Sequence, residues 1–99
     1  DALALALAQE LVAGGHDQAL EIKQRAFAYM PYMHSESLPI HEKAVQLFDQ
    51  PGLENNLRFE VLHRDVIARF GRYPHRNAAL GRVSTPGELA FMAQPGSSF

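Results

Sequence analysis

Residues 54–70 read ENNLRFEVLHRDVIARF, and this segment decides the fold class. Its apolar residues recur three and four positions apart, which is the spacing of one face of an α-helix. Gly71 follows directly and predicts the end of that helix. The sequence therefore predicts a long amphipathic helix over 54–70 with a wide apolar face. The two adjacent rows of that face are Leu57, Val61 and Ala68, and Phe59, Leu62, Val66 and Phe70.

Four further segments show helical spacing, and no segment favours a strand. Asp1 and Asp17 stand at N-cap positions of the first two, Pro31 is expected to stop or kink the second, and Ser35 or Ser37 is expected to cap the third. The last has a Thr-Pro-x-Glu start typical of a capping box. We expect helices of about 10 to 17 residues, and Asn77 to Leu80 are expected to form one further turn. The four segments are 1–13, 17–30, 38–49 and 86–94.

The predicted fold class is an all-α domain of antiparallel helical hairpins, because short connections place neighbouring helices side by side in opposite directions. The chain of 99 residues has the size of one domain. It contains no cysteine, which excludes disulfides, thiolate metal sites and a cysteine nucleophile. No apolar run approaches the ~20 residues of a membrane span. A soluble, cytoplasmic protein without a membrane partner is expected.

Positive charge is concentrated around residues 70–82, which read FGRYPHRNAALGR. Residues 58–82 hold six arginines against two carboxylates, whereas the remainder holds three cations against nine anions, and the overall charge is −2. An acidic chain disfavours non-specific nucleic-acid binding. The sequence thus contains a basic segment in an acidic molecule.

Two main interpretations of this segment stay open. Cations near the end of helix 54–70 can offset the negative end of its dipole or pair with acidic neighbouring helices. Alternatively, guanidinium groups can bind a carboxylate or phosphate beside the His75 imidazole. Glu36 is also placed to pair with an arginine of this segment, and nucleic-acid contact is the least favoured interpretation. The candidate anion-binding residues are Arg72, His75, Arg76, Asn77, Arg82, His34 and Glu36.

The sequence assigns no catalytic residue, metal site or cofactor, and it leaves open whether the protein is an enzyme. No two histidines have the His-Glu-x-x-His spacing, and no serine lies in a Gly-x-Ser-x-Gly turn. His41 and His63 are interpreted as structural histidines on apolar helix faces. Asp65 and Arg69 are expected to form a surface pair four residues apart.

Two longer motifs resemble a known family. YMPYMHSES at 29–37, and RFGRYPHRNAALGR with STPGELAF over 69–91, are similar to the C-terminal half of the bacterial DUF924 family. The resemblance implies a tetratricopeptide-like α-α superhelix, no established activity, and a larger domain whose N-terminal half, with its Asp-Gln-Phe-Pro-Arg-Asn motif, is absent here. The chain departs from the family pattern at Val83 and Gly87, where acidic residues are expected. The motif positions are His34, Ser35, Glu36, Arg72, Pro74, His75, Arg76, Asn77, Gly81, Arg82, Ser84, Thr85 and Pro86.

The leading functional hypothesis is a helical scaffold that binds a protein or peptide partner. The partner could be the missing N-terminal half or a second copy of the chain. The alternative is a small-molecule or hydrolytic site for an anionic phosphate or carboxylate ligand, built on the arginine, histidine and asparagine cluster.

Overall fold

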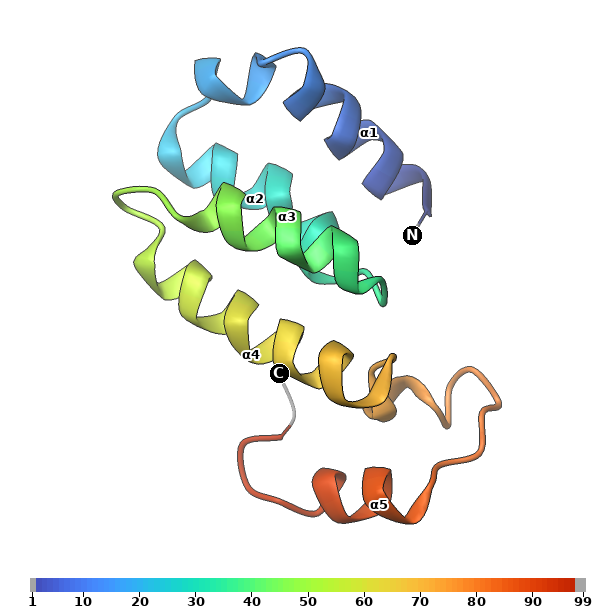
Figure 1. The fold of residues 1–99 in the computed structure, drawn as a ribbon. Helices are drawn as coiled ribbons and strands as arrows, with labels where there is room; N and C mark the ends of the chain where they lie inside the picture. The colour runs from blue at the N-terminus through green and yellow to red at the C-terminus, as the bar shows by residue number, and fades with distance from the viewer. Residues whose placement is uncertain (1, 98–99) are drawn as a thin grey trace.

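The structure is a computed structural model that describes residues 2–97. These residues form helices and connecting turns without a strand, which confirms the predicted all-α class (Figure 1). The predicted N-cap role of Asp1 lies outside the described residues. The elements in chain order are α1 (Ala2–Ala13), the 3₁₀ helix η1 (His16–Ala19), α2 (Ile22–Met33), α3 (Leu38–Phe48), α4 (Glu54–Phe70), the 3₁₀ helix η2 (Pro74–Arg76) and α5 (Pro86–Met92).

Consecutive helices contact one another along the array, from α1 through α2 and α3 to α4 (Figure 1). The radius of gyration is 14.4 Å and the molecule measures 45 × 26 × 19 Å. A compact domain of this length would have a radius of gyration of about 13 Å. The array is therefore elongated, with α1 and α5 at opposite ends. No helix within residues 2–97 combines the length and apolarity that crossing a bilayer requires.

The main core lies between α1, α2, α3 and the start of α4. Tyr29 and Phe48 are fully buried, and their rings meet edge to face with centroids 5.6 Å apart. A second, smaller core of Val66, Ile67 and Tyr73 lies under the basic segment at the other end of α4. The main core consists of Ala8, Tyr29, Tyr32, Met33, Ala44, Leu47, Phe48 and Leu53.

The predicted helix over 17–30 is wrong at both ends. Asp17 lies in η1, where its buried carboxylate accepts hydrogen bonds from Tyr29 and Gln18 instead of capping a helix. Arg25 fixes this segment by donating to the carbonyl oxygens of Asp17, Gln18 and Leu20. These hydrogen bonds hold residues 16–20 apart from α2, which begins at Ile22.

Pro31 does not stop this helix. It lies inside α2, which continues to Met33, and the N–H of His34 still reaches the carbonyl of Met30 at 3.1 Å. A proline inside a helix costs about 3 kcal/mol. Burial of Tyr32 and Met33 in the main core offsets that cost, since each is less than 5% exposed.

The bounds of α4 are confirmed, but its predicted apolar face is only partly buried: Val66 is in the second core, and Leu57 and Phe70 pack against the two cores. Phe59 and Leu62 are 52% and 44% exposed, whereas Glu60 and His63 are buried. Nδ1 of His41 lies 2.8 Å from the Glu60 carboxylate across the α3 and α4 contact. This pair turns a polar stripe of α4 inward, and hydropathy patterning cannot identify such a stripe.

The C-terminal part begins where Gly71 ends α4 in a left-handed conformation with φ 73°. The 3₁₀ helix η2 at Pro74–Arg76 is followed by the expected turn over 77–80, where the Leu80 N–H donates to the Arg76 carbonyl at 3.0 Å. Helix α5 has the predicted capping box, since the Glu88 N–H donates to Thr85 Oγ1 and the Thr85 N–H donates to Glu88 Oε1. With seven residues, α5 is shorter than expected.

Ser37 occupies the N-cap position of α3 without a capping hydrogen bond from its side chain.

Candidate functional site

The basic loop, residues 71–85, connects α4 to α5, and Arg72 is its first cation. Nε and Nη2 of Arg72 donate to the two Glu88 carboxylate oxygens at 2.8 and 2.7 Å, and Nη2 also donates to the Val83 carbonyl. The Arg72 guanidinium, followed by the Thr85 backbone N–H, lowers the pKa of Glu88 to about 2. Arg72 therefore anchors α5 to the end of α4.

Arg82 forms a second fork at the other side of the loop. Its Nη1 and Nη2 donate to Glu36 at 2.9 and 3.1 Å, and Nη2 also donates to the Tyr73 carbonyl. The Tyr73 N–H donates to Glu36 at 2.6 Å. The Arg82 hydrogen bond is the main cause that lowers the pKa of Glu36. An arginine of the basic segment thus pairs with Glu36 across 46 positions of sequence.

Asn77 completes this internal network and is 1% exposed. Its Oδ1 accepts from Arg82 Nε at 3.0 Å, and its Nδ2 donates to Ser84 Oγ at 3.0 Å. Arg72, Asn77, Arg82 and Glu36 were predicted to bind an anion. In the structure their side chains are paired internally, with one another, with Glu88 and Ser84 or with the backbone of the loop, and none of them lines the cavity described next.

Below this network, His41 and Glu60 form a buried pair that supports Tyr73. Nε2 of His41 lies 2.5 Å from the Ser35 carbonyl oxygen, which can only accept, so Nε2 carries a proton. On the other side of the ring, Nδ1 lies 2.8 Å from the Glu60 carboxylate. The Tyr73 hydroxyl donates to the Met33 carbonyl and lies 3.0 Å from Nε2 of His41. The pair holds the Tyr73 ring in place beneath the loop.

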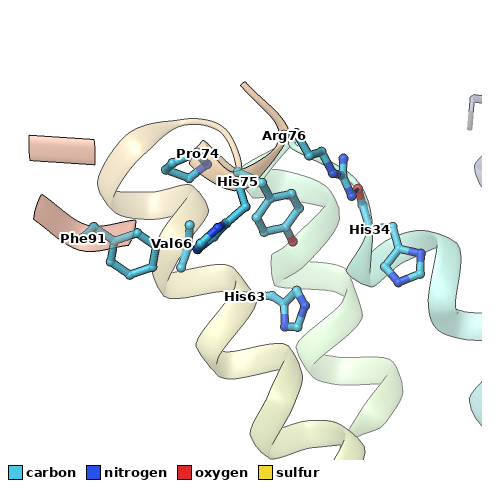
Figure 2. A pocket seen from close by; sticks show the side chains of 8 residues that line it. His34, His63, Val66, Pro74, His75, Arg76 and Phe91 are labelled. Atoms are coloured by element: carbon cyan, nitrogen blue, oxygen red, sulfur yellow. Dashed lines mark hydrogen bonds between the residues drawn. The ribbon is translucent and has the colours of Figure 1, made fainter. Parts of the chain in front are cut away.

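Beside the basic loop lies a cavity of about 260 Å³ that brings three histidines and one arginine together (Figure 2). Figure 2 shows Phe91, Val66 and Pro74 toward one side and Arg76 with His34 toward the other. Three of the predicted anion-binding residues, His34, His75 and Arg76, meet here. The cavity is lined by His34, His63, Val66, Tyr73, Pro74, His75, Arg76 and Phe91.

The lining histidines are held in different ways. Nδ1 of His63 lies 2.6 Å from the Phe59 carbonyl oxygen, which can only accept, so Nδ1 donates. Burial lowers the pKa of the His63 side chain. Burial also lowers the pKa of His34, and the positive charge of Arg76 lowers it further. Nε2 of His75 lies 3.3 Å from Ser97 Oγ. Imidazole and guanidinium groups of this kind can bind an oxyanion. The residues that line the cavity include no serine or cysteine that could act as a nucleophile.

Other predicted contacts differ in detail. Asp65 pairs with its neighbour Arg64 at 3.4 Å rather than with Arg69. The guanidinium carbon of Arg69 lies 4.7 Å from the centre of the Phe70 ring. His41 and His63 are buried, as their structural interpretation predicted. Within residues 2–97, no group of three or more histidine, aspartate or glutamate side chains is arranged to hold a metal ion.

His63, Val66 and Phe91 were not among the predicted site residues. They belong to two helices that the basic loop separates, so sequence spacing does not bring them together. The helical spacing of His63 and Val66, three positions apart, was the only signal that could have placed them on one face.

The sequence of this chain matches the model of one known protein family. Residues 1–96 match the family model described as "Bacterial protein of unknown function (DUF924)". The chain belongs to this family. A search of the curated proteins gives no match.

A solved structure of a protein of unknown function from Agrobacterium tumefaciens is similar to the DUF924 chain, with 38% sequence identity and a TM-score of 0.86. The similarity covers 92% of this chain and 51% of the Agrobacterium chain. This DUF924 chain therefore spans about half the length of that relative. The likeness establishes a shared helical fold and assigns no activity.

Proposed function

We propose that this chain is a helical scaffold. It binds an apolar helix, which a separate protein segment supplies, in the groove beside α1. The observation that carries this proposal is a groove of about 670 Å³ between α1 and the second half of α2. Phe27 lies in it and is 80% exposed, although a phenylalanine of a folded domain is ordinarily buried. Its lining is mainly apolar and includes Ala2, Ala4, Leu5, Phe27, Met30 and Pro31.

The outer face of α1 gives the same indication. Leu3 and Leu7 are 67% and 57% exposed on the outermost helix of the array. In stacked helical arrays, a terminal helix with a polar outer face keeps the protein soluble. An outermost helix built of alanine and leucine is instead typical of a helix that packs against a further neighbour, and exposed apolar patches mark interaction surfaces.

The occupant we propose is a helical segment of the same fold. The Agrobacterium relative has about as much chain again beyond the matched part, and the proposal assigns to that part the helices that pack on α1 and α2. A second copy of the chain is the competing occupant. Where the groove meets the basic loop it is lined by polar residues, Glu36 and Arg76 among them, and Glu36 is held there by Arg82.

Co-expression tests the proposal. The chain is produced together with the part of the Agrobacterium protein that the match leaves out, and light scattering after size-exclusion chromatography gives the stoichiometry. We expect a one-to-one complex that Phe27→Glu abolishes. Phe59→Glu is the matched control, because Phe59 is exposed on α4 outside the groove, and it should leave the complex intact.

Absence of a complex, or a complex that Phe27→Glu leaves intact, would contradict the proposal. A homodimer of the chain that Phe27→Glu dissociates would show that the occupant is a second copy rather than a helical segment of the fold. Charge reversal at Arg72 is unsuitable as a probe of binding, because it would break the contact with Glu88.

A further inference from the structure

The three arginines of the basic loop differ in how their charge is used. Arg72 and Arg82 each face a carboxylate through two nitrogens. Within residues 2–97, Arg76 forms no ion pair with a carboxylate. The charge of Arg76 is therefore the one in this loop that the fold does not neutralise by direct pairing.

Arg76 is nevertheless held in a fixed position. Its Nη2 donates to the His34 carbonyl at 2.8 Å, and its guanidinium carbon lies 4.6 Å from the centre of the Tyr73 ring. Tyr73 is itself fixed by the bond from its hydroxyl to Met33. A cation that is ordered before a ligand arrives loses less conformational entropy on binding. Arg76 is thus prepared to bind an anion without a further change of its own.

The cavity next to Arg76 has two chemically different walls. Val66, Pro74 and Phe91 supply apolar surface, and the Phe91 ring lies 6.1 Å from the His75 ring. His34, His75 and Arg76 supply polar nitrogens (Figure 2). The residues that line the cavity include no carboxylate. The potential in the cavity therefore favours negative charge at the Arg76 side only.

We propose that this cavity binds a small organic anion, with its oxyanion group against Arg76 and His34 and its apolar part against Val66 and Phe91. The volume of about 260 Å³ is slightly below the usual range of ligand sites, ~300–1,000 Å³. It therefore suits a ligand of the size of one substituted ring. The shared chemistry is an apolar group that carries a carboxylate or a phosphate.

A titration followed by ¹H–¹⁵N NMR tests this proposal with four probes. Benzoate and phenyl phosphate carry the two oxyanions, benzamide is the uncharged counterpart of benzoate, and inorganic phosphate lacks the apolar part. We expect benzoate or phenyl phosphate to shift the signals of His34, Val66 and Arg76, and benzamide to leave them unchanged. Which of the two anions binds more tightly identifies the preferred head group.

Matched variants separate this site from general charge effects. Arg76→Gln should weaken binding at least tenfold, since hydrogen bonds to charged groups contribute about that much. Arg58→Gln removes the same charge from the exposed start of α4, where Arg58 bonds Asn55, and should leave the affinity unchanged. The NMR spectrum of each variant without ligand reports whether it is folded.

Three results would overturn the proposal. The first is no shift of these signals with either organic anion at millimolar concentration, and the second is benzamide binding as tightly as benzoate. The third is equal loss of affinity in Arg76→Gln and Arg58→Gln. Inorganic phosphate that bound as tightly as phenyl phosphate would overturn the assignment of Val66 and Phe91 as the apolar wall. Neither Phe27 nor the co-expressed segment takes part in this test, so its failure and that of the proposed scaffold function are distinguishable.

Discussion

The basic loop and the groove beside α1 differ in whether their unusual side chains have a partner inside the molecule. In the loop, charges that look like a surface binding site are paired with buried or half-buried carboxylates inside the molecule. In the groove, a large aromatic side chain that looks like core is 80% exposed. The comparison teaches that unusual composition does not locate a binding surface by itself. What matters is whether the fold already supplies the partner.

The largest effect is expected where the support of the basic loop is broken. His41→Leu leaves the Glu60 carboxylate buried without its partner, and loss of one member of a buried pair costs about 3 to 5 kcal/mol of unfolding free energy. His41→Leu/Glu60→Leu removes both members and should recover most of that loss. Urea unfolding of the two variants at neutral pH measures the difference. Equal destabilisation of the single and double variants would show that the pair is not the cause.

The second effect concerns the fork between Glu36 and Arg82. Glu36→Gln keeps the size of the side chain but removes the charge that binds Arg82 and the Tyr73 N–H. Because Glu36 is about one quarter exposed, we expect a loss of about 2 kcal/mol in unfolding free energy. Glu42→Gln on the exposed side of α3 is the control and should change stability by less than ~0.5 kcal/mol. A loss of the same size in both variants would argue against a specific role of the fork.

The third effect appears only in acid. The Arg72 hydrogen bonds hold the folded-state pKa of Glu88 at about 2, below its ordinary value of 4.5. A depressed carboxyl pKa stabilises the fold above the ordinary pKa, and this contribution is lost as the pH falls from 4.5 toward 2. The unfolding free energy of Glu88→Gln should therefore fall less steeply over that window than that of the unchanged chain. Parallel acid limbs in urea titrations at several pH values would contradict this assignment.

Local signals in the sequence predicted much of the fold, and long-range partners account for the errors. The periodicity of 54–70 and the capping box at Thr85 and Glu88 are local, and both are found in the structure. The start of α2 was misplaced because Asp17 binds Tyr29, twelve positions away. The buried face of α4 was misplaced in part, because Glu60 binds His41 and is buried, whereas Phe59 and Leu62 are exposed. Hydropathy patterning assigns charged residues to the surface and cannot identify a buried pair.

The candidate site was predicted in part for the same reason. His34, His75 and Arg76 were predicted as anion-binding residues and lie around one cavity. Arg72 and Arg82 were predicted with them but face Glu88 and Glu36. Sequence alone kept both interpretations of these arginines open, since an arginine available to a ligand and one paired internally have the same local sequence.

The central claim is that the paired loop charges of Arg72 and Arg82 serve the fold, whereas we propose that the exposed aromatic of the groove serves a partner. The most direct test is the unfolding free energy of Arg82→Gln and Phe27→Glu, each measured on the chain alone. We expect Arg82→Gln to lose about 1 to 2 kcal/mol, because it breaks the bonds to Glu36. Phe27→Glu should change stability by less than ~0.5 kcal/mol. The reverse order, with Phe27→Glu destabilising and Arg82→Gln neutral, would contradict the account.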